Sequence, residues 1–590
     1  MAKKIQAIID NKKITADKDQ TILEAAKKNG IEIPALCYHP DLDIKSNCRI
    51  CVVEIKGVPD LKPACRTVIK DGMKIITNSS KIRKARKINL ELIFAQHYEE
   101  CNDCVWNFNC QLLKLAKKYN VKIARFPDRK TDFPVYQFGP SLIFDSSKCI
   151  DCRNCVDICK KQGIGFLEIK KRGYKIGIVP SKDKNKDCIY CGQCIVHCPA
   201  GALEAVGEFE EVEKPLQQTE DKIVIAQFAP AIRTSIGEEF NMPYGALITK
   251  KLAAGIKKLG FDKVFDTSVG ADFSTCEEAN ELIERLKSKE KLPMFTSCCP
   301  AWVKYIEFYH PEFIPNLTTV RSPHIILGGL IKTFWAKREK IDPRKIVVVS
   351  IMPCVAKKYE ITRSELKING LTPVDYVLTT RELAYLFKKH KIDLKKIKGQ
   401  NLDDPLGFPS GAGVIYGATG GMIESALRTA YEKLTPRQNK FGAGQSGKKL
   451  LKLSFGQVRG MEGIRQAEIK MNSQLIRVAI VNGIGNAQKI LKELKKKPNL
   501  YDYVEVMACL GGCIGGGGQP VPTDPEIRKH RADGLYRADK AKKMRLAHEN
   551  PIVKRVYKDF FTLQKIHLIC HTKYQRKKRE GFKILPKGAH

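Results

Sequence analysis

The spacing of the cysteines is the feature that most constrains this chain. There are 22 cysteines among 590 residues, and most of them stand in closely spaced groups. The first residues, MAKKIQAIIDNKK, contain no apolar leader segment, so we expect a cytoplasmic protein. In that compartment grouped cysteines more often bind metals than form disulfides. The pattern therefore predicts several metal centres on a multidomain chain.

The clearest group is an internal repeat within residues 126–212. A CxxCxxCxxxC run occurs twice, as Cys149, Cys152, Cys155 and Cys159 and again as Cys188, Cys191, Cys194 and Cys198. Such a run lets three thiolates face one cubane cluster while the fourth cysteine ligates the other cluster. We therefore predict two [4Fe-4S] clusters, with Cys198 completing the first and Cys159 the second. Zinc fits two matched runs of this spacing poorly.

Two further groups precede the repeat. Residues 1–80 combine the β-rich runs 5–9, 52–55 and 74–77 with a helical stretch at 21–29, and they contain Cys37, Cys48, Cys51 and Cys65. These four thiolates suit a [2Fe-2S] cluster, with zinc as the alternative.

Residues 81–125 look helical and contain His97, Cys101, Cys104 and Cys110. This set alone fits structural zinc as readily as a [4Fe-4S] cluster, but its place between two iron–sulfur modules favours a relay cluster.

From residue 223 onward the pattern indicates an α/β domain. Apolar strands such as 346–350 and 478–481 alternate with helical stretches such as 245–259. Three motifs in this region contain cysteines: TSCCPAW (296–302), MPCVAKK (352–358) and MACLGGCIGGGGQP (507–520). Their residues Cys299, Cys354, Cys509 and Cys513 could hold one more cubane. The GIG at 483–485 is predicted to be a strand-to-helix turn and not a nucleotide loop, because the third glycine is missing.

These three motifs, together with the preceding modules, resemble the [FeFe]-hydrogenases over essentially residues 1–572. The resemblance implies an H-cluster, in which a cubane shares the Cys513 thiolate with a diiron site that has CO and CN⁻ ligands and is inserted by maturation proteins. It also implies reversible H₂ oxidation and proton reduction. The expected fold is α+β and α/β: a β-grasp [2Fe-2S] ferredoxin domain (1–80), a HisCys3 [4Fe-4S] module (81–125), a bacterial-ferredoxin-like 2[4Fe-4S] domain (126–212), an α/β catalytic H-cluster domain (213–572) and a solvated, frayed basic tail (573–590).

The resemblance further implies a proton relay and a pocket. The relay residues are Cys298, Glu278, Thr318, Glu281 and Arg285, and the pocket residues are Pro230, Met352 and Lys357. The helical spacing of Glu278, Glu281 and Arg285 places them on one face. Three positions, Ala231, His324 and Tyr416, depart from the serine, glutamine and phenylalanine frequent in relatives, and we expect them to affect potential, catalytic bias or inhibitor sensitivity. Cys276 and Cys570 fit no ligand set and are expected to be ordinary thiols.

The charge of the chain bears on its partners. Lys and Arg number 103 against 64 Asp and Glu, a formal net charge of +39. A basic surface suits a small acidic electron carrier, so ferredoxin is the expected partner. No nucleic-acid-binding fingerprint and no apolar run long enough to span a membrane are found.

Two alternative functions remain. One is a catalytic subunit of an NAD(P)H-linked or electron-bifurcating complex, with flavin and NADH subunits docking at residues 1–125. The second is a non-catalytic H₂ sensor or iron–sulfur carrier. The retained Cys298 disfavours the second.

Overall fold

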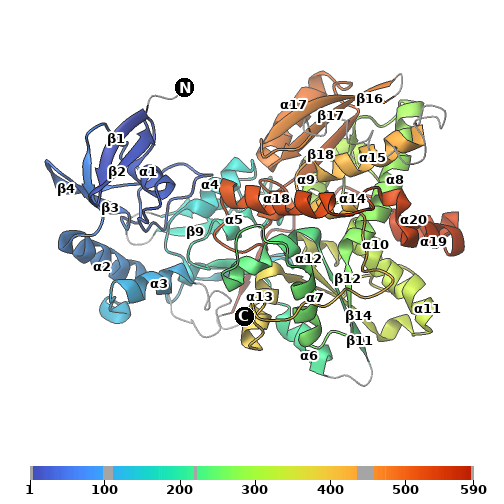
Figure 1. Cartoon of the computed structure of the whole chain (residues 1–590), viewed down its shortest axis with the longest axis horizontal. Coiled ribbons are helices and arrows are strands. Elements are labelled where there is room, and N and C mark those ends of the chain that lie inside the picture. The colour runs from blue at the N-terminus through green and yellow to red at the C-terminus, as the bar shows by residue number, and fades with distance from the viewer. Residues whose placement is uncertain are drawn as a thin grey trace.

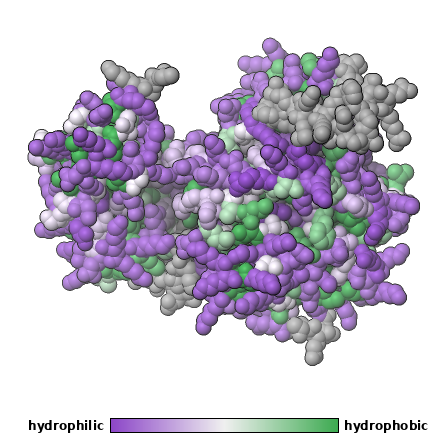
Figure 2. All heavy atoms as spheres, in the orientation of Figure 1, coloured by the Kyte–Doolittle hydropathy of each residue, from purple (hydrophilic) through white to green (hydrophobic). Residues whose placement is uncertain are grey.

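A computed structural model describes residues 4–97, 110–171, 173, 176–217, 222–434, 458–471 and 474–586. The N-terminal domain lies at one end of the molecule, the cysteine repeat in the middle and the α/β region at the other end (Figure 1). Hydrophilic residues cover most of the face seen in Figure 2, as the lysine-rich composition requires. Within the described ranges, no helix is long and apolar enough to cross a bilayer.

The N-terminal domain is a mixed five-stranded sheet with one short helix, as expected for a β-grasp fold. The strand order is β2-β1-β5-β3-β4, in which β1 pairs parallel with β5 and antiparallel with β2. The helix begins after Thr21, which forms a capping box with Glu24. The elements are β1 (Lys4–Ile9), β2 (Lys12–Asp17), α1 (Ile22–Lys28), β3 (Val52–Ile55), β4 (Val58–Pro63) and β5 (Lys74–Ile76).

Two helices follow, α2 (Ser80–Phe94) and α3 (Gln111–Lys118). The side chain of Ser79 accepts a hydrogen bond from the Ile82 amide and so starts α2. Cys110 stands at the N-cap of α3, where unpaired amides and the helix dipole favour a thiolate. Of the predicted HisCys3 ligands, His97 and Cys110 are described, whereas Cys101 and Cys104 lie outside the described residues.

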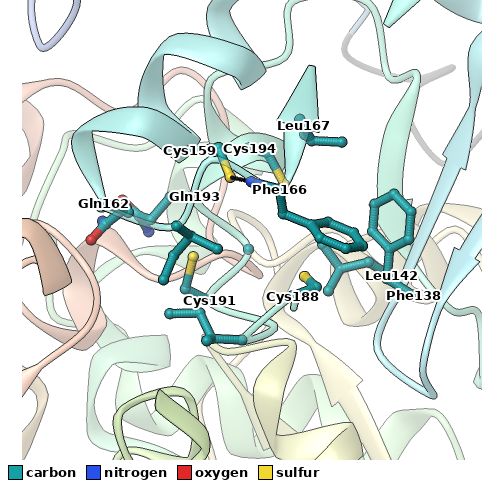
Figure 3. Close-up of a pocket in the computed structure, with 13 residues that line it drawn as sticks. Phe138, Leu142, Cys159, Gln162, Phe166, Leu167, Cys188, Cys191, Gln193 and Cys194 are labelled. Atoms are coloured by element: carbon teal, nitrogen blue, oxygen red, sulfur yellow. Dashed lines mark hydrogen bonds between the residues drawn. The ribbon is translucent and has the colours of Figure 1, made fainter. Parts of the chain in front are cut away.

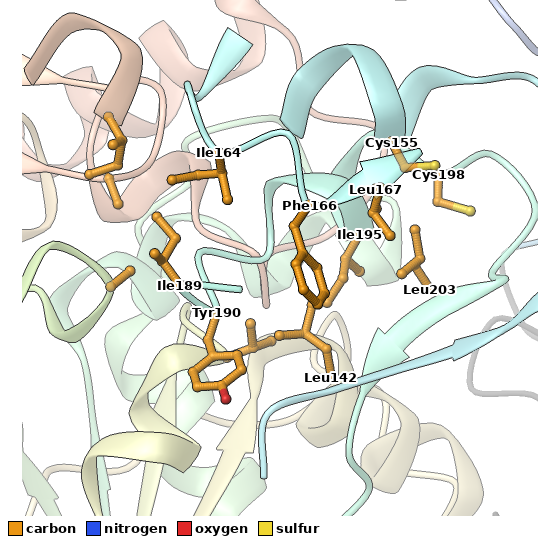
Figure 4. Close-up of a cluster of buried hydrophobic side chains, with 14 of the residues drawn as sticks. Leu142, Cys155, Ile164, Phe166, Leu167, Ile189, Tyr190, Ile195, Cys198 and Leu203 are labelled. Carbon is orange, nitrogen blue, oxygen red and sulfur yellow. The ribbon is translucent and has the colours of Figure 1, made fainter. Parts of the chain in front are cut away.

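The cysteine repeat forms a small domain around a sheet of order β10-β7-β6-β19 and a β8-β9 hairpin. Its elements are β6 (Val135–Phe138), β7 (Leu142–Asp145), α4 (Asn154–Lys161), β8 (Leu167–Lys170), β9 (Gly177–Pro180), α5 (Gln193–Val196), β10 (Leu203–Ala205) and β19 (Lys583–Leu585). Leu142, Phe166, Leu167, Ile195 and Leu203 gather around Cys155 and Cys198 in its interior (Figure 4). The cluster ligands therefore belong to the hydrophobic core.

Strand β19 corrects the expectation of a solvated, frayed basic tail for residues 573–586. It pairs antiparallel with β6, and Phe582 packs edge-on against Tyr136. Arg579 donates to the carbonyl oxygens of Ser181 and Lys186. The positive charges of this segment favour solvation, but apolar Phe582 and the strand hydrogen bonds fix it on the cluster domain.

The α/β region contains two four-stranded sheets. One is parallel, in the order β12-β11-β14-β15, and the other has the order β13-β18-β17-β16, in which only β16 is antiparallel. Their strands are β11 (Ile223–Phe228), β12 (Lys263–Asp266), β13 (Met294–Phe295), β14 (Ile346–Met352), β15 (Tyr376–Thr379), β16 (Ile464–Met471), β17 (Gln474–Asn482) and β18 (Tyr503–Met507). Strand β14 is entirely buried, as a central parallel strand requires.

Helices cover both sheets. They are α6 (Phe209–Gln217), α7 (Thr249–Lys258), α8 (Thr267–Ser288), α9 (Pro300–Tyr309), α10 (Pro323–Leu330), α11 (Ala336–Glu339), α12 (Ala356–Glu360), α13 (Thr380–Lys389), α14 (Gly411–Val414), α15 (Gly421–Leu434), α17 (Ile484–Lys496), α18 (Pro525–Lys540), α19 (Pro551–Asp559) and α20 (Leu563–Cys570). The GIG segment is a strand-to-helix turn between β17 and α17, as predicted. A Cβ at Gly485 would lie 2.1 Å from the Lys161 carbonyl oxygen, so this glycine permits close contact with the cluster domain.

Candidate active site and metal centres

The three cysteine motifs meet because they follow the carboxyl ends of parallel strands. TSCCPAW follows β13, MPCVAKK includes the end of β14, and MACLGGC includes the end of β18. Ligand sites in parallel α/β sheets form at this edge. Residues after β11 and β12 also line the same cavity. Two sheets thus direct their loops into one pocket.

Four cysteines line this pocket: Cys299, Cys354, Cys509 and Cys513. All four are free, and burial raises the pKa of each thiol. Cys299 is the N-cap of α9, so its thiolate would be favoured by the helix N-terminus. Four convergent sulfur donors without disulfides fit a [4Fe-4S] cubane, whose iron would stabilise the otherwise costly thiolates.

The eight cysteines of the repeat form two separate cradles, and each cradle combines the first three cysteines of one run with the fourth cysteine of the other run. Cys159 lines one cavity with Cys188, Cys191 and Cys194, as Figure 3 shows, and Cys198 lines the other with Cys149, Cys152 and Cys155. In the first cradle the Phe166 amide donates to Cys159 Sγ over 3.2 Å. Each cradle provides the four sulfur ligands that a [4Fe-4S] cluster needs.

The cradle that contains Cys159 and Cys191 touches the catalytic pocket directly. Cys509 Sγ lies 3.7 Å from the carbonyl oxygen of Cys191. Gly192 packs against Gly517, and a Cβ on Gly192 would lie 2.8 Å from the Gly517 Cα. Gly192 has a φ of +67°, so its left-handed backbone conformation and its close contact with Gly517 both favour a residue without a side chain. This backbone contact places the two cysteine sets next to each other.

The remaining metal sites lie toward the N-terminus. Cys37, Cys48, Cys51 and Cys65 are free and at least half-buried. A hydrogen bond from Cys48 lowers the pKa of Cys37 to about 6, and one from Cys51 lowers that of Cys65 to about 7. His97 Nδ1 lies 2.8 Å from the Lys148 carbonyl oxygen, so Nδ1 donates and Nε2 is left with its lone pair for a metal.

A buried ion pair sits in the wall of the pocket. Lys357 donates to Glu360 Oε2 over 2.6 Å and to the carbonyl oxygen of Cys298 over 3.0 Å. Burial would lower the pKa of Lys357, but the Glu360 carboxylate raises it above its usual value, so the ammonium stays charged. A fixed buried cation at this place suits an anionic ligand group such as cyanide.

The unusual His324 supports this ion pair. Its Nε2 donates to Glu360 Oε2 over 2.6 Å, and its Nδ1 lies 3.1 Å from Ser350 Oγ. Burial and the nearby Lys357 charge lower the pKa of His324 to about 4, so the ring is neutral. The sequence identified the departure at His324 but missed Glu360, because its lysine partner at spacing three could equally mark a solvated helix.

The first two relay residues lie near one another. Cys298 lines the pocket, with its Sγ 2.7 Å from Met422 Sδ. Burial raises the pKa of the Cys298 thiol, and the neighbouring Cys513 and Cys299 thiols add to the effect. Burial also raises the pKa of Glu278 to about 8. Its Oε1 has no hydrogen-bond partner among the described residues, which leaves it free to exchange a proton.

The outer relay residues are joined by hydrogen bonds. Thr318 Oγ1 donates to Glu281 Oε2 over 2.7 Å, and Arg285 Nη2 donates to Glu281 Oε1 over 2.5 Å. Glu278, Glu281 and Arg285 all lie on α8. The described hydrogen bonds thus join Thr318, Glu281 and Arg285 directly, and the proton transfer from Cys298 through Glu278 to Glu281 stays a prediction. Tyr503, whose buried hydroxyl lies near the Glu278 carboxyl group, had no signal in the sequence beyond its strand position.

The remaining expected pocket residues, Pro230, Met352, Ala231 and Tyr416, also line the cavity. Ala231 is fully buried, so a serine hydroxyl is replaced here by a methyl group. The Tyr416 hydroxyl lies 2.9 Å from Thr275 Oγ1, and burial raises its pKa, so the phenol stays neutral. Cys276 and Cys570 are buried and free, and they lie in none of the described cysteine sets.

Comparison with protein families divides the chain in the same way. The C-terminal domain of the iron-only hydrogenase large subunit matches residues 222–517, and the iron hydrogenase small subunit matches 525–577. The 2Fe-2S iron–sulfur cluster binding domain matches 2–80, and the 4Fe-4S dicluster domain matches 148–210. The NADH-ubiquinone oxidoreductase-G iron–sulfur binding region matches 86–125, so the module containing His97 is matched by a cluster-binding region.

Individual relatives agree. The chain is 39% identical to the NADP-reducing hydrogenase subunit HndD of Solidesulfovibrio fructosivorans, covering 97% of this chain and 99% of the relative. It is 38% identical to iron hydrogenase 1 of Clostridium pasteurianum, covering 96% and 99%. A solved apo form of the [FeFe]-hydrogenase HydA1 of Chlamydomonas reinhardtii aligns with a TM-score of 0.55 and 36% identity over 63% of this chain and 99% of that chain. The chain therefore belongs to the iron-only, or [FeFe]-, hydrogenase large-subunit family.

Proposed function

We propose that this protein is a catalytically active hydrogenase that interconverts protons, electrons and H₂. The observation that supports this most strongly is the cavity in which four buried or half-buried cysteines meet Cys298 and the charged Lys357. The cysteines would hold the cubane of the H-cluster, with Cys513 as the shared thiolate. When bound, that cofactor supplies the site where two electrons and two protons combine to H₂ or are released from it.

The residues of the chain would bind, orient and move protons around that site. Lys357, held in place by Glu360 and Cys298, would bind an anionic ligand through its ammonium group. Cys298 would exchange a proton with Glu278, and Glu281 would pass it on with the help of Thr318 and Arg285. A carboxyl group with a pKa near 8 can both take and give a proton near neutral pH.

The electron partner is proposed to be ferredoxin or a similar small acidic carrier. The net charge of +39 favours a docked partner of opposite charge. A second candidate role, as the catalytic subunit of an NADP-linked complex, is favoured by the similarity to subunit HndD over 97% of the chain. Activity of the isolated chain with reduced ferredoxin alone would support the first role, and strict dependence on added flavin and nicotinamide-binding subunits would support the second.

The deciding experiment is infrared spectroscopy of the protein after maturation with the diiron cofactor, followed by dithionite-driven H₂ evolution. We expect CO and CN⁻ bands together with gas evolution. Bands without gas would contradict catalysis and favour a sensor. No bands, under conditions that mature a control hydrogenase, would leave an iron–sulfur electron carrier.

A further inference from the structure

A chain of hydrogen bonds leaves the relay at Glu281 and continues away from Arg285. Thr319 Oγ1 lies 3.0 Å from Glu281 Oε2 and 2.8 Å from His571 Nδ1. His571 Nε2 lies 3.1 Å from Glu277 Oε2, and the Tyr557 hydroxyl donates to Glu277 Oε1. Thr319 and His571 are absent from the relay that the family resemblance implies, so this connection is a separate observation.

The position of His571 is fixed by the backbone around it. Val320 and His571 form a β-bridge, and the Thr572 amide donates to the Thr319 carbonyl oxygen over 2.8 Å. Arg321 Nε donates to the His571 carbonyl oxygen over 2.7 Å. The C-terminal segment therefore holds the imidazole against Thr319. Its side chain is 16% exposed, so the ring also reaches solvent.

The donors and acceptors along this hydrogen-bond chain allow a proton to pass between His571 and Glu281. The Thr319 hydroxyl has one proton and lies between a carboxylate and an imidazole nitrogen. When it donates to Glu281, His571 Nδ1 must donate to it; when Glu281 is protonated, the hydroxyl can donate to Nδ1 instead. Changing from one arrangement to the other moves one proton between Glu281 and His571, with Thr319 both receiving and giving one.

The other neighbour of Glu281 cannot take part in such an exchange. Among the described contacts, Arg285 donates to Glu281 and otherwise to backbone carbonyl oxygens, and a guanidinium stays protonated in proteins. Histidine, by contrast, is the side chain whose ordinary pKa lies near neutral pH. Within the described hydrogen-bond chain, His571 is thus the group suited to exchange protons with solvent.

Both negatively and positively charged side chains surround His571. Glu277 and Glu281 on α8 face it from one side, Tyr557 on α19 contacts Glu277, and the exposed His567 ring on α20 lies 5.4 Å away. Arg285, Arg321 and Lys433 are the nearby cations. Burial would raise the pKa of Glu277, but hydrogen bonds from His571 and Tyr557 hold it below its usual value, so Glu277 is an anion beside the imidazole.

We propose that His571 is the proton-exchanging residue at the solvent end of the relay, connected to Glu281 through the Thr319 hydroxyl. During H₂ evolution, imidazolium Nδ1–H passes its proton to Thr319 Oγ1 while the Thr319 proton passes to Glu281. This leaves neutral His571 with its proton on Nε2, and Nδ1 then regains a proton from solvent or buffer. During H₂ oxidation the same transfers run backward. His571 does not touch the pocket, so it is a positioning residue and not a catalytic one. The inference rests on the proposed relay through Glu278 and Glu281.

The test compares His571→Gln with wild type and with His567→Gln in the matured, full-length enzyme. His567 is a matched control, because it is an exposed histidine one turn earlier on the helix that His571 caps. Dithionite-reduced methyl viologen at saturation would drive H₂ evolution between about pH 5.5 and 8.5, the range around the ordinary histidine pKa, in H₂O and in D₂O. Infrared bands and iron content would verify that all three proteins contain equal amounts of cofactor.

We expect His571→Gln to lower the rate at neutral pH by about fivefold and to raise the solvent isotope effect. The loss should stay below the roughly 100-fold expected for an obligatory acid–base group, because Glu281 itself is partly exposed and can reach water. The pH profile should lose its ionisation in the histidine range. Added imidazole should restore the rate of His571→Ala, a rescue that a merely structural role would not give. His567→Gln should behave as wild type.

A second variant tests the connection. Thr319→Val removes the hydroxyl while keeping the backbone amide that donates to Glu281, and it should cause a similar loss that does not add to that of His571→Gln. A His571→Gln enzyme with the rate, pH profile and isotope effect of wild type would overturn the proposal. If wild type makes H₂ but Cys298→Ala does so equally well, the relay itself fails, which is a different outcome from an unaffected His571 variant.

Discussion

The buried pair of Lys357 and Glu360 allows a quantitative prediction. The carboxylate accepts hydrogen bonds from Lys357 and from His324, both over 2.6 Å, and all three side chains are at least nine-tenths buried. Burial would raise the pKa of Glu360, but Lys357 and His324 lower it from 4.5 to about 2. That difference corresponds to about 3 kcal/mol of stability at neutral pH. Glu360→Gln keeps the shape of the side chain and removes the charge, so Lys357 would become an uncompensated buried cation.

The effect can be measured by urea unfolding of the catalytic domain. Trp302 and Trp335 are both buried there, so their fluorescence reports its unfolding. We expect Glu360→Gln to lower the unfolding free energy by about 3 kcal/mol at neutral pH. The matched control is Glu312→Gln, which breaks an exposed pair with Lys495 and should cost less than about 1 kcal/mol.

The pH dependence gives an independent check of the same reasoning. A carboxyl group whose pKa falls on folding contributes its full stability above its unfolded pKa of about 4.5. The contribution is then lost as the pH falls toward 2. The difference between wild type and Glu360→Gln should therefore shrink below pH 4.5 and be constant above it. Equal stability of Glu360→Gln and Glu312→Gln at neutral pH would refute the argument that the pair is electrostatically coupled.

Two more predictions concern the relay. Cys298→Ala should abolish turnover while the infrared bands and iron content remain, because its thiol is the proposed first proton carrier from the pocket; near-normal H₂ evolution would contradict the relay. Glu278 has a pKa raised to about 8, so the folded protein binds a proton there that the unfolded chain releases, and stability should fall as the pH rises from about 4.5 to 8. Glu278→Gln should remove this slope in urea unfolding, and an unchanged slope would show that Glu278 does not titrate as proposed.

The sequence predicts the metal centres well because cluster ligands leave a strong local pattern. The run Cys188, Cys191 and Cys194 specifies three ligands of one cradle, and the shared pattern of two-cluster proteins supplies Cys159 as the fourth. The strand 346–350 was recognised because a buried parallel strand is continuously apolar. Such short-range signals survive in the sequence whatever the tertiary arrangement is.

Other parts of the site have no local pattern. Glu360 and His324 are 36 residues apart, and Thr319 and His571 are 252 apart, so their contacts depend on the fold alone. Burial decides whether a carboxylate is a surface charge or a proton carrier, and a single glutamate in a helix does not reveal its burial. The cradles could therefore be predicted from spacing, whereas the surrounding polar network required the structure.

The basic C-terminal segment shows how composition can mislead, and it leads to a last prediction. Removing residues 579–590 would delete strand β19, the Arg579 hydrogen bonds to the Ser181 and Lys186 carbonyl oxygens and the Glu580 ion pair with buried Lys304. Phe582 would no longer pack against Phe166, which lines the cradle containing Cys159. Lys304 would keep only Asp187 as an ionic partner among the described contacts.

We expect this truncation to weaken the cluster domain by about 1.4 kcal/mol, since half-buried Phe582 contributes up to about that much and the lost pairing of β19 with β6 adds to it. A loss of this size makes local opening about tenfold more frequent. The cluster absorbance of the truncated protein should therefore bleach about tenfold faster under an iron chelator, while a truncation of residues 587–590 serves as the control. Equal bleaching rates for the two truncations would mean that the C-terminal segment does not stabilise the cluster domain. Faster loss of the cluster absorbance after removal of residues 579–590 would show that this lysine- and arginine-rich segment protects the cluster. Its apolar and hydrogen-bonded residues, and not its charge, would then determine where it lies.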